Sequence, residues 1–478
     1  MPLRNLGWLL GVVGVFALGF AVAYTAPSEE KSRDYGNMKL LVDVMEQVRK
    51  NYVTELTPDK ERKLFEDMIN GGLERLDPHS AYINPHDLKQ FDKSSKGSFG
   101  GIGIQLGTDR QNHGQLTVIS PMVGTPAYEK GVLAGDSILK IDGKSTEGMR
   151  IGEAVDLITG DIGKDITLTI QHEGAKEPID VTITRAEIKV QSVMGDQRKP
   201  GNPKAWEYML DNENRIGYIR LTAFSENAAQ ELHDAVAELE KDGVRGLILD
   251  LRNNPGGLLE QAVKISDLFL TEGPIVTIKG RNDKERVYEA HEAGTMLVPA
   301  EKYPMVVLVN KFSASASEIV SAALQDHKRA VVIGERSYGK GSVQNVIKLD
   351  EGEHGKSALK LTTASYWRPS GKNIHRFPDS KESDEWGVKP NEGFEVPMKD
   401  EERLEYLIYR NDRDVVRGKN PPAKSEEKKE EKKDEPKDGD KKEKKPFEDR
   451  VLQKAVDYMR GEIKKVGALP MLPEVVPS

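Results

Sequence analysis

The sequence predicts a multidomain α+β protein in which a β-rich module precedes an α/β core. Its 478 residues are enough for two to four domains of ordinary size. Residues 97–187 are dense in glycine and contain short alternating apolar runs, which is typical of strands joined by tight turns. Residues 188–400 instead alternate apolar strands with amphipathic helices, as in an α/β domain with crossover helices.

The amino terminus has the composition of an export signal. Residues 5–28 carry no charge, and Arg4 precedes them. The stretch approaches the roughly 20 residues that span a bilayer, so residues 1–26 are predicted to be a signal peptide or a retained membrane anchor. A buried core helix is the alternative. Either form of the signal places the rest of the chain outside the cytoplasm, in a periplasmic or cell-envelope space.

Apolar residues at helical spacing flank the two large segments. Residues 34–95 are predicted to form a helical segment, in which Thr57-Pro58 marks the start of the second helix. Residues 447–465 predict a C-terminal amphipathic helix. Between the core and this helix, 19 of the 22 residues at 424–445 are charged, and such a run cannot bury enough apolar surface to fold. We expect a disordered linker that lets the last helix dock on the core.

The individual elements follow from the same patterns. In the β-rich module, strands are predicted at residues 116–120, 137–143, 165–174 and 178–188, around a short helix at 149–160. In the core, strands are predicted at 215–221, 246–251, 304–310 and 330–334, with helices at 228–243, 258–270 and 317–327.

The first turn with catalytic potential lies at residues 311–327, where a predicted strand ends and a helix begins. A serine in such a turn has an exposed hydroxyl group, and the amides at the start of the helix favour negative charge. The same serines also fit a helix cap, with Ser317 as the cap and Glu318 in the first turn. The turn itself leaves a nucleophile and a cap both open.

The second such turn is GERSYGKGSVQNV (334–346), where Lys340 lies between two glycines after a buried strand. A lysine acts as a general base only when neutral, which requires burial or nearby dipoles to lower its pKa from about 10.4. An exposed turn lysine is the ordinary alternative. The residues also nearly match the phosphate-binding pattern G-x-x-x-x-G-K-[ST]. Position 341 is Gly, however, and the residues after it alternate like a strand rather than a helix.

The third turn is NNPGG at residues 253–257, between a strand and a helix. Glycine amides at a helix start can form an oxyanion hole, although a plain turn has the same pattern. Weaker candidates are a metal site near His79, His86 and Asp87, and a Ser/His/Asp triad with His327 or His375.

Five segments together resemble the carboxyl-terminal processing (tail-specific) serine peptidases. They are LDPHSAYI (76–83), GSFGGIGI (97–104), DLRNNPGGLL (250–259), SASASEI (313–319) and ERSYGKGSVQ (335–344). The last two, in this order and spacing, are highly specific. The resemblance covers residues 35–400 and the final helix. It implies a PDZ-like module at 97–187, inserted before a peptidase core of the crotonase or Clp-protease type at 188–400.

The resemblance also implies a role for each turn. The central serine of SASASE, Ser315, would be the nucleophile, and Lys340 would be the general base that takes its proton. Gln344 would orient the lysine. The oxyanion donors would be the amide of Ala316 and that of Gly256 or Gly257. No metal or organic cofactor is implied.

The PDZ-like module is expected to bind the free carboxyl terminus of a protein or peptide substrate. Gly100-Gly101-Ile102-Gly103-Ile104 resembles the loop whose amides catch the terminal carboxylate while the tail adds as an extra strand. Some relatives carry an arginine, coupled to substrate sensing, at the position of Thr159. The departure leaves open whether the module gates activity in the same way.

The sequence therefore predicts an exported Ser/Lys endopeptidase that recognises substrate tails. A non-catalytic PDZ scaffold and a nucleotide hydrolase are the alternatives. The resemblance implies a homo-oligomer and leaves an activating adaptor open. The net charge of −8 argues against nucleic-acid partners, and membrane contact is expected only through the N-terminal segment. The absence of cysteine excludes disulfides, thiolate metal sites and a cysteine nucleophile.

Overall fold

A computed structural model describes residues 29–109, 114–281, 284–350, 355–418 and 447–468, which fall into two compact units that divide between Tyr82 and Ile83. The predicted signal or anchor at residues 1–26 and the predicted linker at 424–445 lie outside the described residues. Within the described ranges, no helix is both long enough and apolar enough to cross a bilayer.

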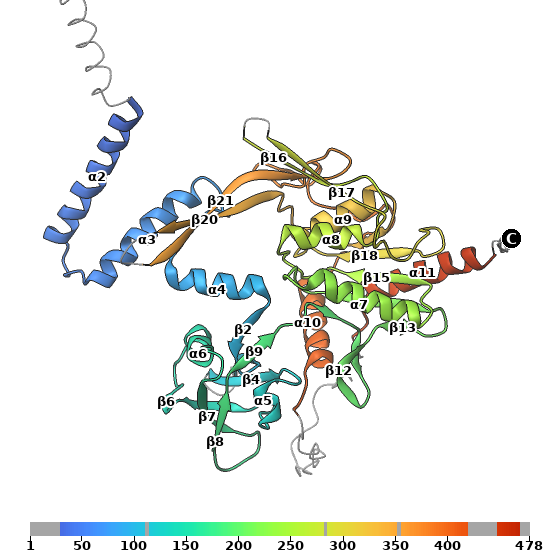
Figure 1. The fold of residues 1–478 in the computed structure, drawn as a ribbon, viewed down its shortest axis with the longest axis horizontal. Coiled ribbons are helices and arrows are strands. Elements are labelled where there is room, and N and C mark those ends of the chain that lie inside the picture. The colour runs from blue at the N-terminus through green and yellow to red at the C-terminus, as the bar shows by residue number, and fades with distance from the viewer. Residues whose placement is uncertain (1–28, 110–113, 282–283, 351–354, 419–446, 469–478) are drawn as a thin grey trace, which may run out of the picture. The chain divides into compact units, whose positions relative to one another are not determined.

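The first unit is helical. It contains α2 (Glu29–Asn51) and α3 (Pro58–Glu74), and the short strand β1 (Ala81–Ile83) begins near its end (Figure 1). As Thr57-Pro58 predicts, α3 begins at Pro58, and the Thr57 hydroxyl accepts a hydrogen bond from the Lys60 amide at 3.4 Å. Arg49 of α2 forms an ion pair with Glu61 of α3.

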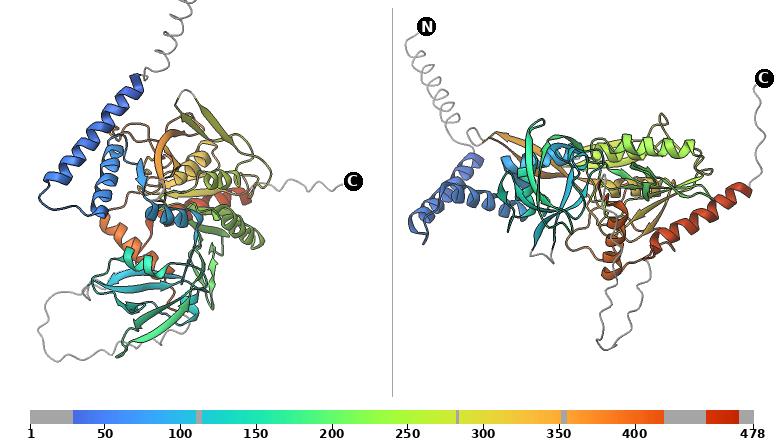
Figure 2. Two further views of the ribbon diagram at one scale, coloured as in Figure 1. Left: turned by 60° about the vertical axis from the view of Figure 1, so that its left-hand side comes forward. Right: turned by 90° about the horizontal axis from the view of Figure 1, so that it is seen from below.

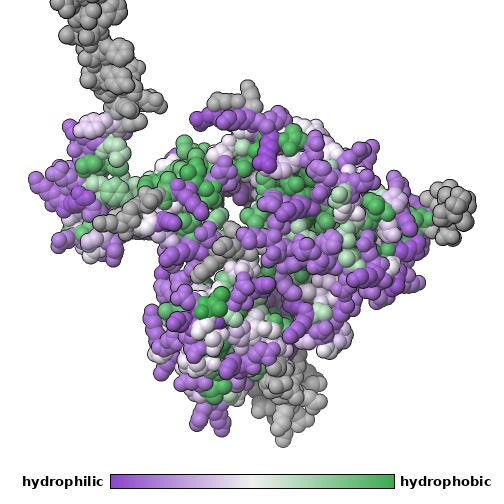
Figure 3. Space-filling view, viewed as in Figure 1, coloured by the Kyte–Doolittle hydropathy of each residue, from purple (hydrophilic) through white to green (hydrophobic). Residues whose placement is uncertain are grey.

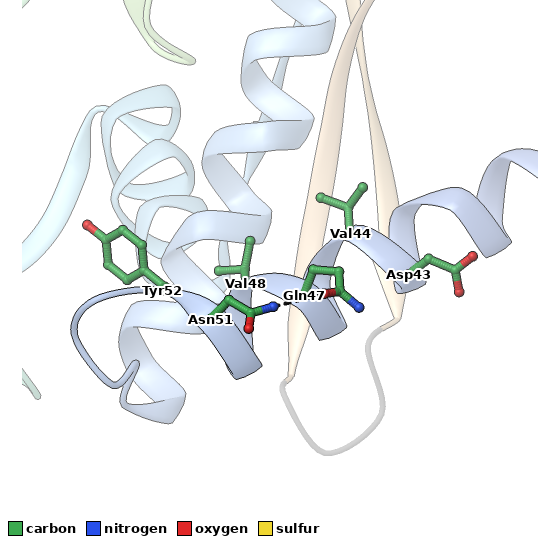
Figure 4. A pocket seen from close by; sticks show the side chains of 6 residues that line it. All are labelled: Asp43, Val44, Gln47, Val48, Asn51 and Tyr52. Carbon is green, nitrogen blue, oxygen red and sulfur yellow. Dashed lines mark hydrogen bonds between the residues drawn. The ribbon is translucent and has the colours of Figure 1, made fainter.

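Several large apolar side chains of this unit are exposed, and the apolar surface over α2 and α3 is visible in Figure 3. They are Met38, Leu40, Val42, Val44, Tyr52, Met68 and Ile69. A shallow pocket, whose exposed lining is almost entirely apolar, lies on one face of α2 (Figure 4), lined by Asp43, Val44, Gln47, Val48, Asn51 and Tyr52.

The β-rich module is an antiparallel sheet in the order β3-β4-β5-β7-β8, with β6 beside β5. Its strands are β3 (Ile104–Asp109), β4 (Gln115–Pro121), β5 (Ser137–Ile141), β6 (Lys144–Ser145), β7 (Asp165–Gln171) and β8 (Ile179–Thr184). Two helices, α5 (Pro126–Glu129) and α6 (Ile151–Ile158), pack with it around a core that includes Ile102, Val118, Ile138, Leu168 and Ile170. The module is entered and left through a two-stranded ribbon, β2 (Ser98–Gly101) and β9 (Ala186–Lys189), which follows α4 (Pro85–Lys96).

The α/β core is built on a mainly parallel sheet. The four predicted core strands are β14 (Ile216–Leu221), β15 (Gly246–Asp250), β18 (Met305–Val309) and β19 (Val331–Gly334). They lie side by side in this order and run parallel, while β10 (Val193–Met194) and β13 (Met209–Asp211) pair antiparallel with β14. Because alternate residues point to opposite faces, these strands contribute to two separate apolar clusters.

Helices cover both faces of this sheet (Figure 2). The predicted helices α7 (Ala228–Lys241), α8 (Leu259–Asp267) and α9 (Ala316–Asp326) pack on one face. The other face is covered by α10 (Asp400–Asp414) and by the C-terminal helix α11 (Arg450–Ala468). Gly246 permits this docking, because a Cβ atom there would collide with the Met459 side chain of α11.

A second, antiparallel sheet runs β20-β21-β16-β17. Its strands are β16 (Pro274–Gly280), β17 (Glu285–Glu289), β20 (Ser342–Asp350) and β21 (Lys356–Trp367). A small ribbon is formed by β11 (Gln197–Lys199) and β12 (Asn202–Glu207).

Candidate active site

The three turns singled out in the sequence lie at one edge of the core sheet. They follow β15, β18 and β19, which are adjacent and parallel, so their carboxyl ends meet at the same edge. Hydrogen bonds join the glycine turn after β15 directly to the serine turn after β18. The Asn254 carbonyl accepts from the Ala314 amide at 3.1 Å and from the Ser317 hydroxyl at 2.9 Å.

Ser315 occupies a strained position at the start of α9. Its φ and ψ angles are 55° and −114°, outside the regions favoured by residues other than glycine. Strain of this kind at a strand-to-helix turn exposes a nucleophilic hydroxyl in other folds. The interpretation of Ser317 as the helix cap is wrong: the helix begins after Ser315, and Ser317 lies inside it.

The Lys340 turn is packed tightly from the other side. A Cβ atom on Gly339 would lie 2.7 Å from the Arg376 Cβ and 3.0 Å from the Trp386 ring, and one on Gly341 would collide with the His375 backbone. The Arg376 amide donates to the Gly339 carbonyl at 2.8 Å. Because the chain continues from this turn into strand β20, the phosphate-binding-loop interpretation, which requires a helix there, is wrong.

The environment of Lys340 favours its neutral form. Burial lowers the pKa of the Lys340 amine below its ordinary 10.5, and the nearby Lys360 lowers it further. The Glu318 carboxylate acts in the opposite direction. The net effect is a lowered pKa, which is what a lysine general base requires.

Glu318 joins the Ser315 turn to the Lys340 turn, a contact that the sequence did not reveal. Its Oε2 accepts hydrogen bonds from the amides of Ser315 and Lys340, both at 2.8 Å. Its Oε1 accepts from the Ser337 hydroxyl and the Gly339 amide, both at 2.6 Å. Burial raises the pKa of this carboxyl group, whereas the four hydrogen bonds oppose that rise. The only sequence signal was its place in the SASASE segment.

The glycine turn lies against Ser315. A Cβ atom on Gly256 would lie 2.8 Å from the Ser315 Cβ and 3.0 Å from the Ala316 amide nitrogen. The Gly256 amide donates to the Asn254 side-chain oxygen at 2.9 Å. In the part of the chain that the structure describes, the amides of Gly257 and Ala316 make no hydrogen bond.

The side chains of Ser315, Lys340 and Gln344, which are predicted to act together, are not hydrogen bonded to one another in the described part of the chain. The Gln344 amide group donates to the hydroxyls of Ser342 at 2.8 Å and Thr362 at 3.1 Å. Across the described residues, no hydrogen bond joins the Ser315 hydroxyl, the Lys340 amine and the Gln344 amide group. Glu318 thus joins the backbones of Ser315 and Lys340. The Gln344 side chain instead bonds to Ser342 on its own strand, β20, and to Thr362 on β21.

The predicted triad histidines are engaged elsewhere. The His327 ring lies 2.7 Å from the Pro274 carbonyl, and the His375 ring packs edge-on against Phe377. His86 lies beside Asp87 and Asp156 on an exposed surface.

The predicted carboxylate loop of the β-rich module is shorter than expected. Gly100 and Gly101 belong to strand β2, paired with β9, and the Ile102 side chain is buried in the module core. Only Ile102 and Gly103 link the strands, and β3 begins at Ile104. The β3 strand that follows is an edge strand of the five-stranded order.

An arginine does lie beside Thr159, but it comes from later in the chain. Thr159 ends α6. Arg185, between β8 and β9, donates to the carbonyls of Leu157 at 2.9 Å and Ile158 at 2.8 Å. It therefore joins the end of α6 to the ribbon that leads out of the module.

Comparison with known proteins identifies both domains. Residues 215–391 match the model of Peptidase family S41, and residues 117–172 match that of the PDZ domain. The Carboxy-terminal-processing protease of Bartonella bacilliformis is 40% identical over 393 residues, which is 81% of this chain and 82% of the relative. The Carboxy-terminal processing protease CtpA of Bacillus subtilis is 36% identical over 382 residues, covering 79% and 73%.

Among solved structures, the photosystem II D1 C-terminal processing protease is 27% identical with a TM-score of 0.40, covering 73% of this chain and 85% of that one. The two domain matches and the similarity to relatives along most of their length agree with the architecture described above. The chain therefore belongs to peptidase family S41, as a serine peptidase of the carboxy-terminal processing type in which a PDZ domain precedes the protease domain.

Proposed function

We propose that this chain is an exported endopeptidase in which Ser315 is the nucleophile and Lys340 the general base. The observation that carries the proposal is the shared Glu318 oxygen, which holds the backbones of both residues at hydrogen-bonding distance from one atom. The strained Ser315 turn and the lowered pKa of Lys340 support the same assignment.

The chemistry follows from these groups. The Ser315 oxygen forms a bond to the substrate carbonyl carbon as neutral Lys340 takes the hydroxyl proton. The resulting lysine ammonium then gives this proton to the departing amine as the peptide C–N bond breaks. Water attacks the acyl-enzyme, again with Lys340 as base, and releases Ser315. Gln344 would orient the lysine after a shift from its Ser342 and Thr362 partners.

Between the two glycines, Gly257 is the better oxyanion donor. The Gly256 amide already donates to Asn254, whereas the amides of Gly257 and Ala316 are not used elsewhere in the described chain. Two such donors stabilise the oxyanion, and losing one typically costs about 10²–10³ in rate.

The PDZ domain would select the substrate. A protein tail adds as a strand beside the edge strand β3, with its terminal carboxylate near the Ile102–Ile104 amides. The free edge of β3 and the packing of α6 next to it support this mode. In this proposal, residues 1–26 direct the protein to a periplasmic or cell-envelope location. It also includes self-association through the exposed apolar side chains of α2 and α3, with an adaptor as a further partner.

The test is digestion of an unfolded protein by the chain that lacks residues 1–26, with the carboxyl terminus of the substrate either free or amidated. Ser315→Ala and Lys340→Ala are compared with Ser383→Ala and Lys311→Ala, which change exposed side chains of the same types. We expect the first pair to be silent, the control pair to cut, and amidation to slow cleavage.

Cleavage by Ser315→Ala would show that the nucleophile is wrongly assigned. Equal rates on free and amidated substrates would contradict tail recognition by the PDZ domain. A folded wild type that fails to cut, with or without candidate adaptors, would favour the scaffold alternative.

A further inference from the structure

Arg252 is a buried cation at the start of the oxyanion turn. Its side chain is only 1% exposed, and it makes two pairs of hydrogen bonds to carboxylates. One pair is local: Nε and Nη2 bond Asp250 at 3.0 and 2.6 Å. The other is distant in sequence: Nη1 and Nη2 bond Asp449 Oδ1 and Oδ2, both at 2.9 Å. Bidentate contacts of this kind fix the guanidinium plane.

The second carboxylate comes from the C-terminal segment. Asp449 immediately precedes α11 and follows the residues 419–446 that the structure does not describe. It is 8% exposed, and its Oδ1 also accepts from the Leu452 amide at 3.0 Å. Asp449 is thus the cap of α11 and, at the same time, the outer partner of Arg252.

Arg252 passes this constraint to the catalytic turns through its neighbours. The next residue, Asn253, donates its amide to the Asn310 side chain at 3.0 Å. Asn254 then accepts from Ala314 and Ser317 on either side of Ser315, and Gly256 and Gly257 follow. A shift of Arg252 would therefore move the oxyanion amides relative to Ser315.

From this connection we infer that Asp449 is a positioning residue for the oxyanion turn, so that the C-terminal helix is a working part of the peptidase site. The inference rests on the proposed roles of Ser315 and Gly257. Docking of α11 does not depend on Asp449 alone. Its apolar residues lie in the core cluster, Arg460 pairs with Asp211, and Arg450 pairs with Glu402.

The deciding variant is Asp449→Asn, which keeps the size of the side chain and remains a good helix cap. It removes the charge that holds Arg252. We expect kcat to fall about 10-fold or more with KM within about 2-fold, because misplacement of a catalytic group on the order of 1 Å costs up to about 10² in rate. The rate at which a fluorophosphonate labels Ser315 should fall in parallel, and Asp449→Glu should restore part of both rates.

Two control variants separate positioning from helix docking. Asp457→Asn makes the same chemical change on an exposed position of α11, where the carboxylate accepts a hydrogen bond from Gln453 of the same helix. Arg460→Gln removes a docking ion pair that does not touch Arg252. Both should keep wild-type kcat at temperatures below their melting transition.

A wild-type kcat in Asp449→Asn would overturn the inference while leaving the Ser315 assignment intact. A loss of kcat in Arg460→Gln that equals the loss in Asp449→Asn at equal Tm would also overturn it, because docking alone would then explain both. If Ser315→Ala still cuts, the proposed function fails first. A selective loss in Asp449→Asn, with Ser315→Ala silent, supports the inference.

Discussion

Glu318 offers the sharpest test of the active site, because one buried carboxylate accepts hydrogen bonds from both catalytic turns. Glu318→Gln keeps the shape of the side chain but turns one acceptor oxygen into an NH2 group. In either orientation this group faces at least one backbone donor. In one orientation the NH2 group faces the amides of Ser315 and Lys340, and in the other it faces the amide of Gly339.

The less costly orientation directs the remaining oxygen to Ser315 and Lys340. In this orientation the Ser337 hydroxyl, which donated to the replaced oxygen, must turn to accept from the new NH2 group, and the buried Gly339 amide is left as a donor without an acceptor. Such a donor costs about 1–3 kcal/mol, which for a domain of this size corresponds to a Tm lower by about 2–12 °C. The displaced lysine turn should lower kcat by about 10²-fold.

The assay combines thermal unfolding with cleavage of a fluorogenic unfolded substrate. Glu231→Gln is the control, because Glu231 is a half-buried carboxylate whose pKa is likewise raised by burial. It accepts the amides of Ser192 and Val193 and touches neither catalytic turn. A Glu318→Gln variant with a lowered Tm but wild-type kcat would refute the role of Glu318 in holding the dyad.

Four further predictions follow from other contacts. Because burial lowers the pKa of Lys340, kcat/KM should rise with pH to a plateau through an apparent pKa below 10.5, measured between about pH 5 and 10; an apparent pKa at or above 10.5 would contradict it. Because of the same pKa shift, the free energy of unfolding should increase with pH between that lowered pKa and 10.5, and Lys340→Met should remove this increase. Gly246→Ala should lower Tm by forcing the Met459 side chain out of place. Met459→Ala should then lower Tm less in the Gly246→Ala background than in the wild type. Additive losses of Tm would contradict the predicted clash. Arg185→Gln should raise KM for substrates with a free carboxyl terminus and leave kcat unchanged, because it releases the end of α6; an unchanged KM would argue against that role.

The strand and helix patterns predicted most of the core because each element has a strong local period. The strands β14, β15, β18 and β19 are short apolar runs followed by turns, and the parallel order then brings the turns together. The meeting of these three turns at one edge of the sheet was therefore accessible from sequence. The pairing of Gly100 and Gly101 in a strand was not, because a glycine-rich run has no side-chain pattern that separates a strand from a loop.

Contacts between distant residues could not be predicted. Glu318 reads locally as an acidic residue in a first helical turn, and nothing in its spacing shows that it reaches Lys340 across a strand and a turn. Asp449 and Arg252 are separated by 197 positions and a charged segment, so only the folded chain reveals their bond. In both cases the information lies in the packing of the sheet and not in any local pattern.

The place of α11 in the chain has a consequence for biosynthesis. Translation delivers the chain from its amino end, and domains generally fold in that order. Of the elements described here, α11 is the last to be made, yet its apolar side covers a face of the central sheet. A chain that is interrupted before residue 449 would leave the part of that face under α11 uncovered and would lack the outer partner of Arg252. Under the proposed roles, chains without α11 would be inactive and susceptible to degradation. Peptidase activity would then appear only after α11 has been synthesised and has docked.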